Sequence, residues 1–220
     1  ALALPAALRL RPRIVHANDW QAGLCPYLLR HEHGEDPALA GARTVFTIHN
    51  LAYQGTFPKQ VVPFLGLPWD VFRHDAMELH DQLSFMKAGL SFADALTTVS
   101  PTYAKEILTP EGGHGLDAVL RHRRADLHGI LNGIDVSEWD PARDPHLPAH
   151  YDAHDLSGKA QVKRALQAEM GLAVRDDLPL LGCIARLVPQ KGIDLILDIL
   201  SELVHLPVQL VFLGSGIPEL

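Results

Sequence analysis

The stretch that most constrains the fold of this chain reads LLGCIARLVPQKGIDL and covers residues 180–195. Its first six residues are almost all apolar, which predicts a strand at 180–185 that is buried on both faces of a parallel sheet. A loop with Pro189 and Gly192 follows, and apolar residues then recur at helical spacing over residues 193–200. The pattern therefore predicts a strand, a charged loop and a helix in immediate succession.

Two cations lie in this loop, Arg186 and Lys191, with no carboxylate between them. In open parallel sheets, ligands bind where the carboxyl ends of strands meet the following helix N-termini, because unpaired N–H groups there attract anions. Arginine offers a planar fork of donors and lysine a compact charge, a combination that suits a phosphate or diphosphate. Two solvated surface charges are the alternative, and spacing alone favours that alternative.

Composition narrows the class of protein. With 220 residues, 47% of them hydrophobic, the chain can form one large domain or two small ones. The net charge of −7 disfavours a nucleic-acid partner, and the basic cluster at 121–124 is too short to change that. No apolar run is long enough for a bilayer, and the first residues lack signal-peptide features. Cys25 and Cys183 are interpreted as small apolar fillers, so we expect a cytoplasmic protein without membrane contact.

Predicted strands alternate with predicted helices along the chain, which indicates an α/β protein with parallel sheets. The expected strands are residues 13–17, 44–48, 95–99, 128–131, 180–185 and 208–213. The expected helices are residues 20–30, 83–93, 157–170 and 193–200, and one that begins at Ser100-Pro101 and runs to about residue 108. Residues 111–115, which read EGGHG, are expected to form a flexible loop.

A change in composition divides the chain. Residues 139–156 are rich in proline, aspartate and histidine, which is typical of a connection between domains. We therefore predict a first domain at residues 1–145, an interdomain connection and helix at 146–178, and the start of a second domain at 179–220.

Polar residues follow the predicted strands of the first domain: Asp19, His49, Asn50 and Asn132. Because parallel strands point their carboxyl ends the same way, these residues should line one rim of the first sheet, which faces the second domain across a cleft. The alternatives remain open, since Asp19 and Asn132 can equally shape turns, and an isolated histidine is more often structural.

Other features favour plain structural interpretations. His31 and His33 alternate near the end of a polar helix and are expected to be exposed to solvent rather than to bind a metal. Residues 214–216, which read GSG, can either let a nucleotide approach the backbone or form a simple turn. No Gly-x-Gly-x-x-Gly fingerprint follows a strand, so nicotinamide chemistry is disfavoured and we expect no cofactor.

Six segments of the chain resemble, in the same order, segments of bacterial glycogen synthases and plant starch synthases. They read HANDWQAGL (16–24), FTIHNLAYQG (46–55), FMKAGL (85–90), TVSPTY (98–103), GILNGID (129–135) and ARLVPQKGID (185–194). Together they span almost the whole chain. Members of this family are retaining glycosyltransferases that elongate α-1,4-glucan from a nucleotide-glucose donor.

The resemblance implies a GT-B fold, with two Rossmann-like domains facing a cleft, both of them incomplete in this chain. It implies that Arg186 and Lys191 bind the donor diphosphate, and that Asp19, His49, Asn50 and Asn132 contact the glucosyl unit or the acceptor end. We take Arg186, Lys191 and His49 as the catalytic residues and the other three as substrate-binding residues. The implied partners are ADP-glucose or UDP-glucose and an α-1,4-glucan.

Departures from the family pattern leave alternatives open. The Lys-x-Gly-Gly-Leu loop and the downstream glutamate motif of the family do not occur in the chain. We therefore expect the middle part of a longer enzyme that is inactive by itself. Another retaining nucleotide-sugar glycosyltransferase is one alternative, although it would not be expected to carry the segment at 46–55. A non-catalytic module that binds glucan or nucleotide is the other.

Overall fold

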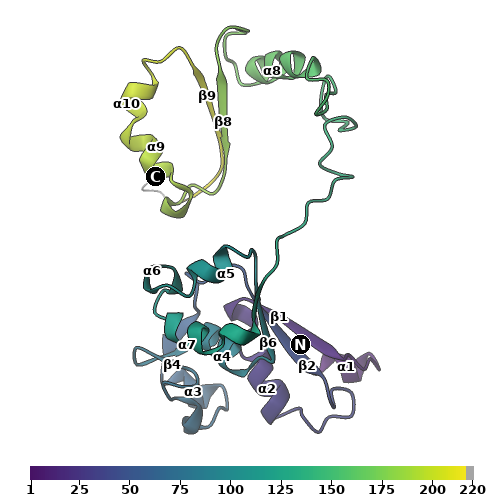
Figure 1. Cartoon of the computed structure of the whole chain (residues 1–220), viewed down its shortest axis with the longest axis vertical. Coiled ribbons are helices and arrows are strands. Elements are labelled where there is room, and N and C mark those ends of the chain that lie inside the picture. The colour runs from purple at the N-terminus through teal and green to yellow at the C-terminus, as the bar shows by residue number, and fades with distance from the viewer. Residues whose placement is uncertain (217–220) are drawn as a thin grey trace. The chain divides into compact units, whose positions relative to one another are not determined.

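The computed structural model describes residues 1–216, which fall into two compact units, Ala1–Gly133 and the chain from Ile134 onward (Figure 1). Each unit is built on a parallel sheet with helices, so the predicted α/β class is confirmed. The predicted domain limits at residues 145 and 178 stay a prediction. Within the described residues, no helix combines the length and the apolar character needed to cross a membrane.

A four-stranded parallel sheet organises the first unit. Its strands, in spatial order, are β1 (Ile14–Asn18), β2 (Arg43–Ile48), β6 (Ala95–Thr98) and β7 (Leu127–Gly129). In register, Asn18 lies opposite Thr47 and Thr47 lies opposite Thr97. All four strands lie within a few residues of the sequence prediction, because they are short apolar or β-branched runs closed by polar residues.

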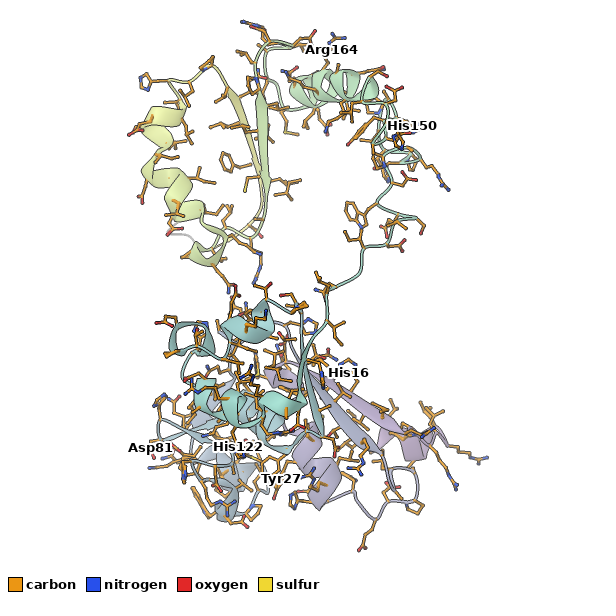
Figure 2. All side chains as sticks on the ribbon, in the orientation of Figure 1. His16, Tyr27, Asp81, His122, His150 and Arg164 are labelled. Atoms are coloured by element: carbon orange, nitrogen blue, oxygen red, sulfur yellow. The ribbon has the colours of Figure 1, made fainter. Side chains whose placement is uncertain are left out.

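Hydrogen-bonded polar side chains cross one face of this sheet. His16 of β1, labelled in Figure 2, bonds through Nε2 to Thr47 Oγ1 at 2.6 Å. Thr47 Oγ1 in turn bonds to Thr97 Oγ1 at 2.5 Å. Three adjacent strands are therefore linked by side chains as well as by their backbones.

The helices of the first unit are short. They are α1 (Leu4–Ala7), η1 (Trp20–Ala22), α2 (Cys25–His31), α3 (Val61–Phe64), η2 (Trp69–Val71), α4 (Phe85–Phe92), α5 (Tyr103–Glu106), α6 (Pro110–Gly113), α7 (Asp117–His122) and η3 (Arg124–Asp126). Helix α4 is the most buried of them, and its Gly89 lies so close to the sheet that a Cβ atom there would be 2.4 Å from the Phe46 ring. The main core joins α4 to the sheet through Phe46, Ile48, Met86, Leu90 and Leu96.

Basic side chains hold both ends of α4. The buried Lys87 donates from Nζ to the carbonyls of His74 and Glu78, each at 2.5 Å. Burial lowers the pKa of Lys87, against the opposing effect of the nearby carboxylates. At the other end, Arg123 donates to the carbonyls of Leu90 and Ala93, each at 2.7 Å. These carbonyls lack helical partners, so Arg123 caps the helix C-terminus.

An antiparallel sheet of three strands was not expected from the sequence. Its strands are β3 (Thr56–Pro58), β5 (Gln82–Ser84) and β4 (Glu78–Leu79), in that spatial order. The prediction of a helix from residue 83 is wrong at its start, because Leu83 pairs with Phe57 and is fully buried. Ser84 then caps α4, since its Oγ accepts from the Lys87 N–H at 3.1 Å.

Two further local predictions needed correction. The expected flexible loop at 111–115 is largely helix α6, because Thr109 Oγ1 accepts from the Gly112 N–H at 3.1 Å and Pro110 suits the first helical turn. The helix expected to run from Ser100 to residue 108 is shorter, although Ser100 Oγ does accept from the Tyr103 N–H at 2.9 Å.

The second unit contains α8 (Gly158–Glu169), β8 (Leu180–Ile184), η4 (Pro189–Lys191), α9 (Ile193–Asp198), α10 (Leu200–Leu203) and β9 (Gln209–Leu213). Strands β8 and β9 pair in parallel. The expected burial of β8 on both faces is wrong in this structure, because Leu181 is 50% exposed and Ile184 is 81% exposed. Among the described residues, β8 has only β9 as a paired neighbour. The helix expected at 193–200 is broken at Ile199.

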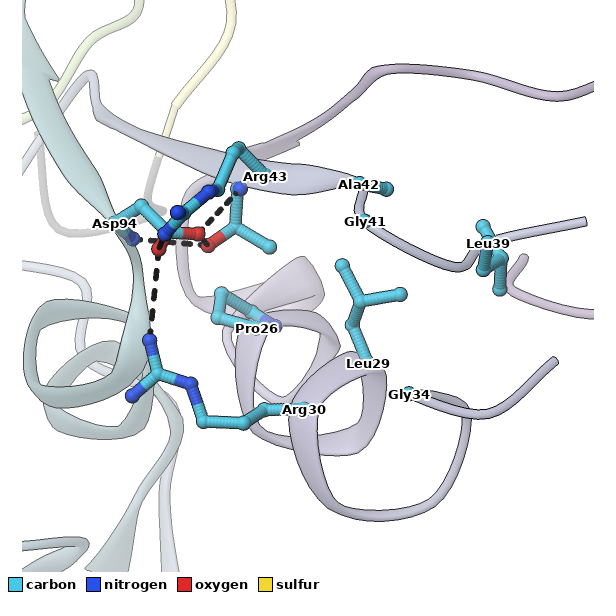
Figure 3. Close-up of a pocket in the computed structure, with 10 residues that line it drawn as sticks. Pro26, Leu29, Arg30, Gly34, Leu39, Gly41, Ala42, Arg43 and Asp94 are labelled. Carbon is cyan, nitrogen blue, oxygen red and sulfur yellow. Dashed lines mark hydrogen bonds and ion pairs between the residues drawn. The ribbon is translucent and has the colours of Figure 1, made fainter. Parts of the chain in front are cut away.

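Asp94 ties together the amino ends of β2 and β6 and the last turn of α2. Its Oδ2 accepts from the Thr44 N–H at 2.7 Å and from Thr44 Oγ1 at 2.8 Å, while Oδ1 accepts from Arg43 at 2.9 Å. Arg30 of α2 lies 3.6 Å from the same oxygen. Figure 3 shows these contacts at the wall of a cavity of about 320 Å³. Burial raises the pKa of Asp94, but the bonds from Thr44 and Arg43 outweigh burial and lower the pKa below its ordinary value.

Replacing Asp94 with alanine should lower the free energy of unfolding by about 1–3 kcal/mol at neutral pH, because the Thr44 N–H loses its acceptor. Since the folded-state pKa is lowered, this stabilisation is present above the unfolded value of about 3.9 and is lost as pH falls through the folded value. Chemical denaturation of the wild type and Asp94→Ala at a series of pH values checks this.

A matched control is Asp177→Ala, because Asp177 pairs with Arg175 on an exposed surface and should contribute little. A loss of stability for Asp94→Ala no larger than that of the control, or a loss that grows as the pH falls below 4, would contradict the assigned role.

Candidate functional site

The carboxyl ends of β1 and β2 bring three of the predicted site residues together. Asp19 follows β1 directly, and His49 and Asn50 follow β2. The Asp19 carboxylate accepts a hydrogen bond from the His49 backbone N–H at 2.8 Å. Asn50 Oδ1 accepts from the Ala52 N–H at 3.1 Å and so shapes the start of the next loop. The expected rim therefore exists at these two strands, as parallel pairing requires.

The His49 ring has a partner that the sequence pattern did not predict. Its Nε2 lies 3.0 Å from Oδ1 of Asn18, the last residue of β1. Both side chains are exposed to solvent at the rim. The only signal in the sequence was that two polar residues, Asn18 and Asp19, close the strand in succession.

Asp19 has an unusual backbone conformation. Its φ is 54° and its ψ is 179°, a region that residues with a side chain rarely adopt. The Asp19 N–H donates to the Thr47 carbonyl at 2.9 Å, which continues the ladder between β1 and β2 by one residue. Asp19 therefore does shape a turn, as one alternative held, and the same turn presents its carboxylate to His49.

The loop after Asn50 is fastened against the core of the first unit. The Leu51 N–H donates to the Tyr103 hydroxyl at 3.0 Å, and Gln54 Nε2 donates to the His114 carbonyl at 2.8 Å. Gly55 has a φ of 56°, and a Cβ atom there would lie 2.2 Å from the Trp20 ring. The segment at 46–55 therefore needs its glycine for close contact with the indole.

Asn132 lies farther along the same sheet edge. It follows β7, which β6 separates from β2, and its side chain is exposed. Within the described residues, Asn132 makes no hydrogen bond with Asp19 or His49. The structure thus places Asn132 on the rim without joining it to the other three residues.

Arg186 and Lys191 lie in the second unit, at the carboxyl end of β8. Arg186 follows the strand and Lys191 ends η4, ahead of Gly192 with a φ of 71°. Both side chains are exposed, and neither forms an ion pair with any of residues 1–216. Their charges are thus available to an anion, as the loop prediction requires.

The glycines at 214 and 216 support this cationic loop. The Leu187 N–H donates to the Ser215 carbonyl at 2.9 Å. Added Cβ atoms at Gly214 and Gly216 would lie 2.0 Å and 1.9 Å from the carbonyl oxygens of Ala185 and Leu187. The close approach that these glycines allow is therefore to the backbone beside Arg186.

No group of three or more metal-ligating side chains occurs within the part of the chain that the structure describes. His31 instead stacks on the Tyr27 ring at a centroid distance of 4.4 Å and meets Phe92 edge-on at 5.9 Å. Packing against aromatic rings thus accounts for the position of the His31 side chain.

Comparisons with known proteins agree with the segments singled out above. The sequence model of the family described as "Starch synthase catalytic domain" matches residues 1–122. The chain is 74% identical over 98% of its length to a glycogen synthase of Anaeromyxobacter dehalogenans, and 57% identical over 97% to one of Myxococcus xanthus. In both comparisons it covers 45% of the relative, so the chain spans about half the length of these curated proteins.

A solved structure of a starch synthase is similar to almost the whole chain. The catalytic domain of starch synthase IV from Arabidopsis thaliana, bound to ADP and acarbose, matches 99% of this chain with a TM-score of 0.91 and 40% sequence identity. This chain covers 45% of that one. The similarity agrees with the α/β, GT-B type of fold that the resemblance implied. With a family match over more than half of its residues, the chain belongs to the starch synthase catalytic domain family, which includes the bacterial glycogen synthases.

Proposed function

We propose that the whole protein to which these residues belong is a glycogen or starch synthase. It transfers glucose from ADP-glucose to the non-reducing end of an α-1,4-glucan and retains the anomeric configuration. One observation carries the proposal: Asp19 and His49, the polar strand ends of two family segments, are hydrogen-bonded at one rim of a chain 74% identical to a glycogen synthase.

The leaving diphosphate determines what Arg186 and Lys191 do. The bond between glucose C1 and the phosphate oxygen breaks, and the diphosphate takes the electron pair. The acceptor hydroxyl oxygen forms the new bond to C1 from the same face, and its proton passes to a phosphate oxygen of the donor. Cations placed where this negative charge develops lower the barrier, so Arg186 and Lys191 stabilise the transition state more than the bound donor.

The rim of the first unit handles the sugar in this proposal. His49 contacts the reacting glucosyl unit, while Asp19, Asn50 and Asn132 contact that unit or the acceptor end. The bond between Asp19 and His49 supports this grouping, because it fixes the backbone from which the imidazole projects. No carboxylate nucleophile is needed, because the diphosphate is already a fair leaving group.

Two observations support the proposed donor, acceptor and cellular compartment. The Arabidopsis relative was solved with ADP and acarbose, which favours an adenine nucleotide and a glucan chain as ligands of the present protein. Both cysteines, Cys25 and Cys183, are free thiols, which fits activity in the reducing cytoplasm.

The whole protein should elongate glycogen when given radiolabelled ADP-glucose, whereas the 220-residue chain alone should not. Among residues 1–216, β8 pairs with one strand and exposes apolar side chains, so the second unit lacks the covering that a stable donor-binding domain needs. Incorporation of label into glycogen measures the activity of the whole protein and that of the 220-residue chain. Preference for UDP-glucose would correct the donor, and glucan binding without transfer by the whole protein would favour the non-catalytic alternative. Elongation by the 220-residue chain would contradict the second expectation.

Lys191→Ala in the whole protein should raise the barrier by about 3 kcal/mol, roughly a hundredfold in turnover, because a charge is lost where the leaving group becomes more negative. Lys191→Arg should recover only part of the rate, because a planar fork does not replace a compact ammonium. Steady-state kinetics and thermal melting are measured together.

Lys105→Ala is the matched control, because Lys105 is an exposed lysine of α5 outside the proposed site. Activity of Lys191→Ala within about twofold of this control, or a loss that only follows a lower Tm, would make Lys191 an ordinary surface lysine.

His49→Ala should lower kcat more than it weakens donor binding, because an imidazole beside the reacting sugar acts mainly in the transition state. Comparison of kcat with the Kd for ADP-glucose separates the two effects. Unchanged turnover with a stable fold would return His49 to a structural role.

A further inference from the structure

Asn18, the last residue of β1, and Asp19, directly after it, both bond to His49, the first residue after β2. Asp19 accepts from the backbone N–H of His49 at 2.8 Å, and Asn18 accepts from the ring of the same residue at 3.0 Å. The backbone and the ring of His49 are therefore each fixed by a separate hydrogen bond. The strained turn at Asp19, with its φ of 54°, is kept in place by the surrounding bonds.

The chemistry of the partner atoms determines the state of the ring. An amide oxygen carries no proton, so in the bond between Asn18 Oδ1 and His49 Nε2 the imidazole must be the donor. A neutral ring with its proton on Nε2 has a lone pair on Nδ1. Within the part of the chain that the structure describes, the ring makes no second hydrogen bond, so Nδ1 is the nitrogen left for a substrate.

We propose that Asn18 is a positioning residue for the reaction: it holds the His49 imidazole in the Nε2-protonated tautomer, so that Nδ1 accepts a hydrogen bond from a hydroxyl of the glucosyl unit. This inference rests on the proposed function. Asn18 itself touches no reacting atom and acts only through His49.

The kinetic test uses the whole protein and a double-mutant cycle. Asn18→Leu keeps a side chain of similar size but has no acceptor, and it should lower kcat about tenfold, the value of one such bond, with the KM for ADP-glucose changed less than about twofold. Asn18→Asp keeps an acceptor oxygen and should recover most of the rate. In a His49→Ala background, Asn18→Leu should have no further effect.

Equal losses from Asn18→Leu in both backgrounds would overturn the proposal, because Asn18 would then act independently of His49. His16→Gln is the control for general disturbance of β1, since His16 lies on the same strand and bonds to Thr47 rather than to His49. A Tm that falls with Asn18→Leu but not with the control, in step with activity, would also overturn it.

A second measurement does not depend on activity. Nitrogen-15 NMR of histidine side chains in the whole protein reports which ring nitrogen carries the proton. The signals of His49 are identified as those that disappear from the spectrum of His49→Ala. We expect the proton on Nε2 in the wild type and a mixture of tautomers in Asn18→Leu. A wild-type ring protonated on Nδ1 would overturn the proposal. If the wild type transfers no glucose, the proposed function fails, while the tautomer still decides whether Asn18 positions His49.

Discussion

The parallel register between β1 and β2 is the constraint on which the site depends. Asn18 lies opposite Thr47, and the Asp19 N–H extends the ladder to the Thr47 carbonyl. This pairing brings the last residues of β1 beside the first residue after β2, so that Asp19 and Asn18 both reach His49. A shift of one residue in this register would turn every side chain of the strand to the opposite face and separate these partners.

Helix α4 gives this sheet edge a rigid support. Gly89 lets the helix approach the Phe46 ring of β2 closely. Lys87 in its first turn binds the carbonyls of His74 and Glu78, and Arg123 binds carbonyls at its C-terminal end. The start of α4 also holds the loop that follows His49, because the N–H groups of Phe85 and Met86 donate to the Gly55 and Gln54 carbonyls at 3.1 Å. Helix α4 therefore supports both the core of the unit and the loop of the candidate site. Such support is how a fold preorganises polar groups for catalysis.

The predictions of secondary structure and burial are wrong where the local residue pattern and the tertiary environment favour different structures. Residues 83 and 84 are predicted as helical because apolar residues continue into α4, yet they belong to β5, which pairs with β3 and β4. The two adjacent glycines at 112 and 113 indicated a flexible loop, but the Thr109 cap and Pro110 start a helical turn there. The apolar run at 180–185 predicted burial, but among residues 1–216 the strand β8 has one paired strand and two exposed apolar side chains. In each case the deciding contact comes from residues that the local pattern does not contain.

The sequence by itself determined the alternation of strands and helices, the polar residues at the strand ends and the two cations after β8. These depend on short-range properties: apolar periodicity, the turn preferences of glycine and proline, and the placement of charge. Only the tertiary structure decided that Asn18 bonds the His49 ring, that Asp19 adopts a strained turn toward the His49 backbone, and that β6 separates the strand before Asn132 from the strand before His49. Such pairings join residues about thirty positions apart, and strand register, which a single local pattern does not encode, brings them together.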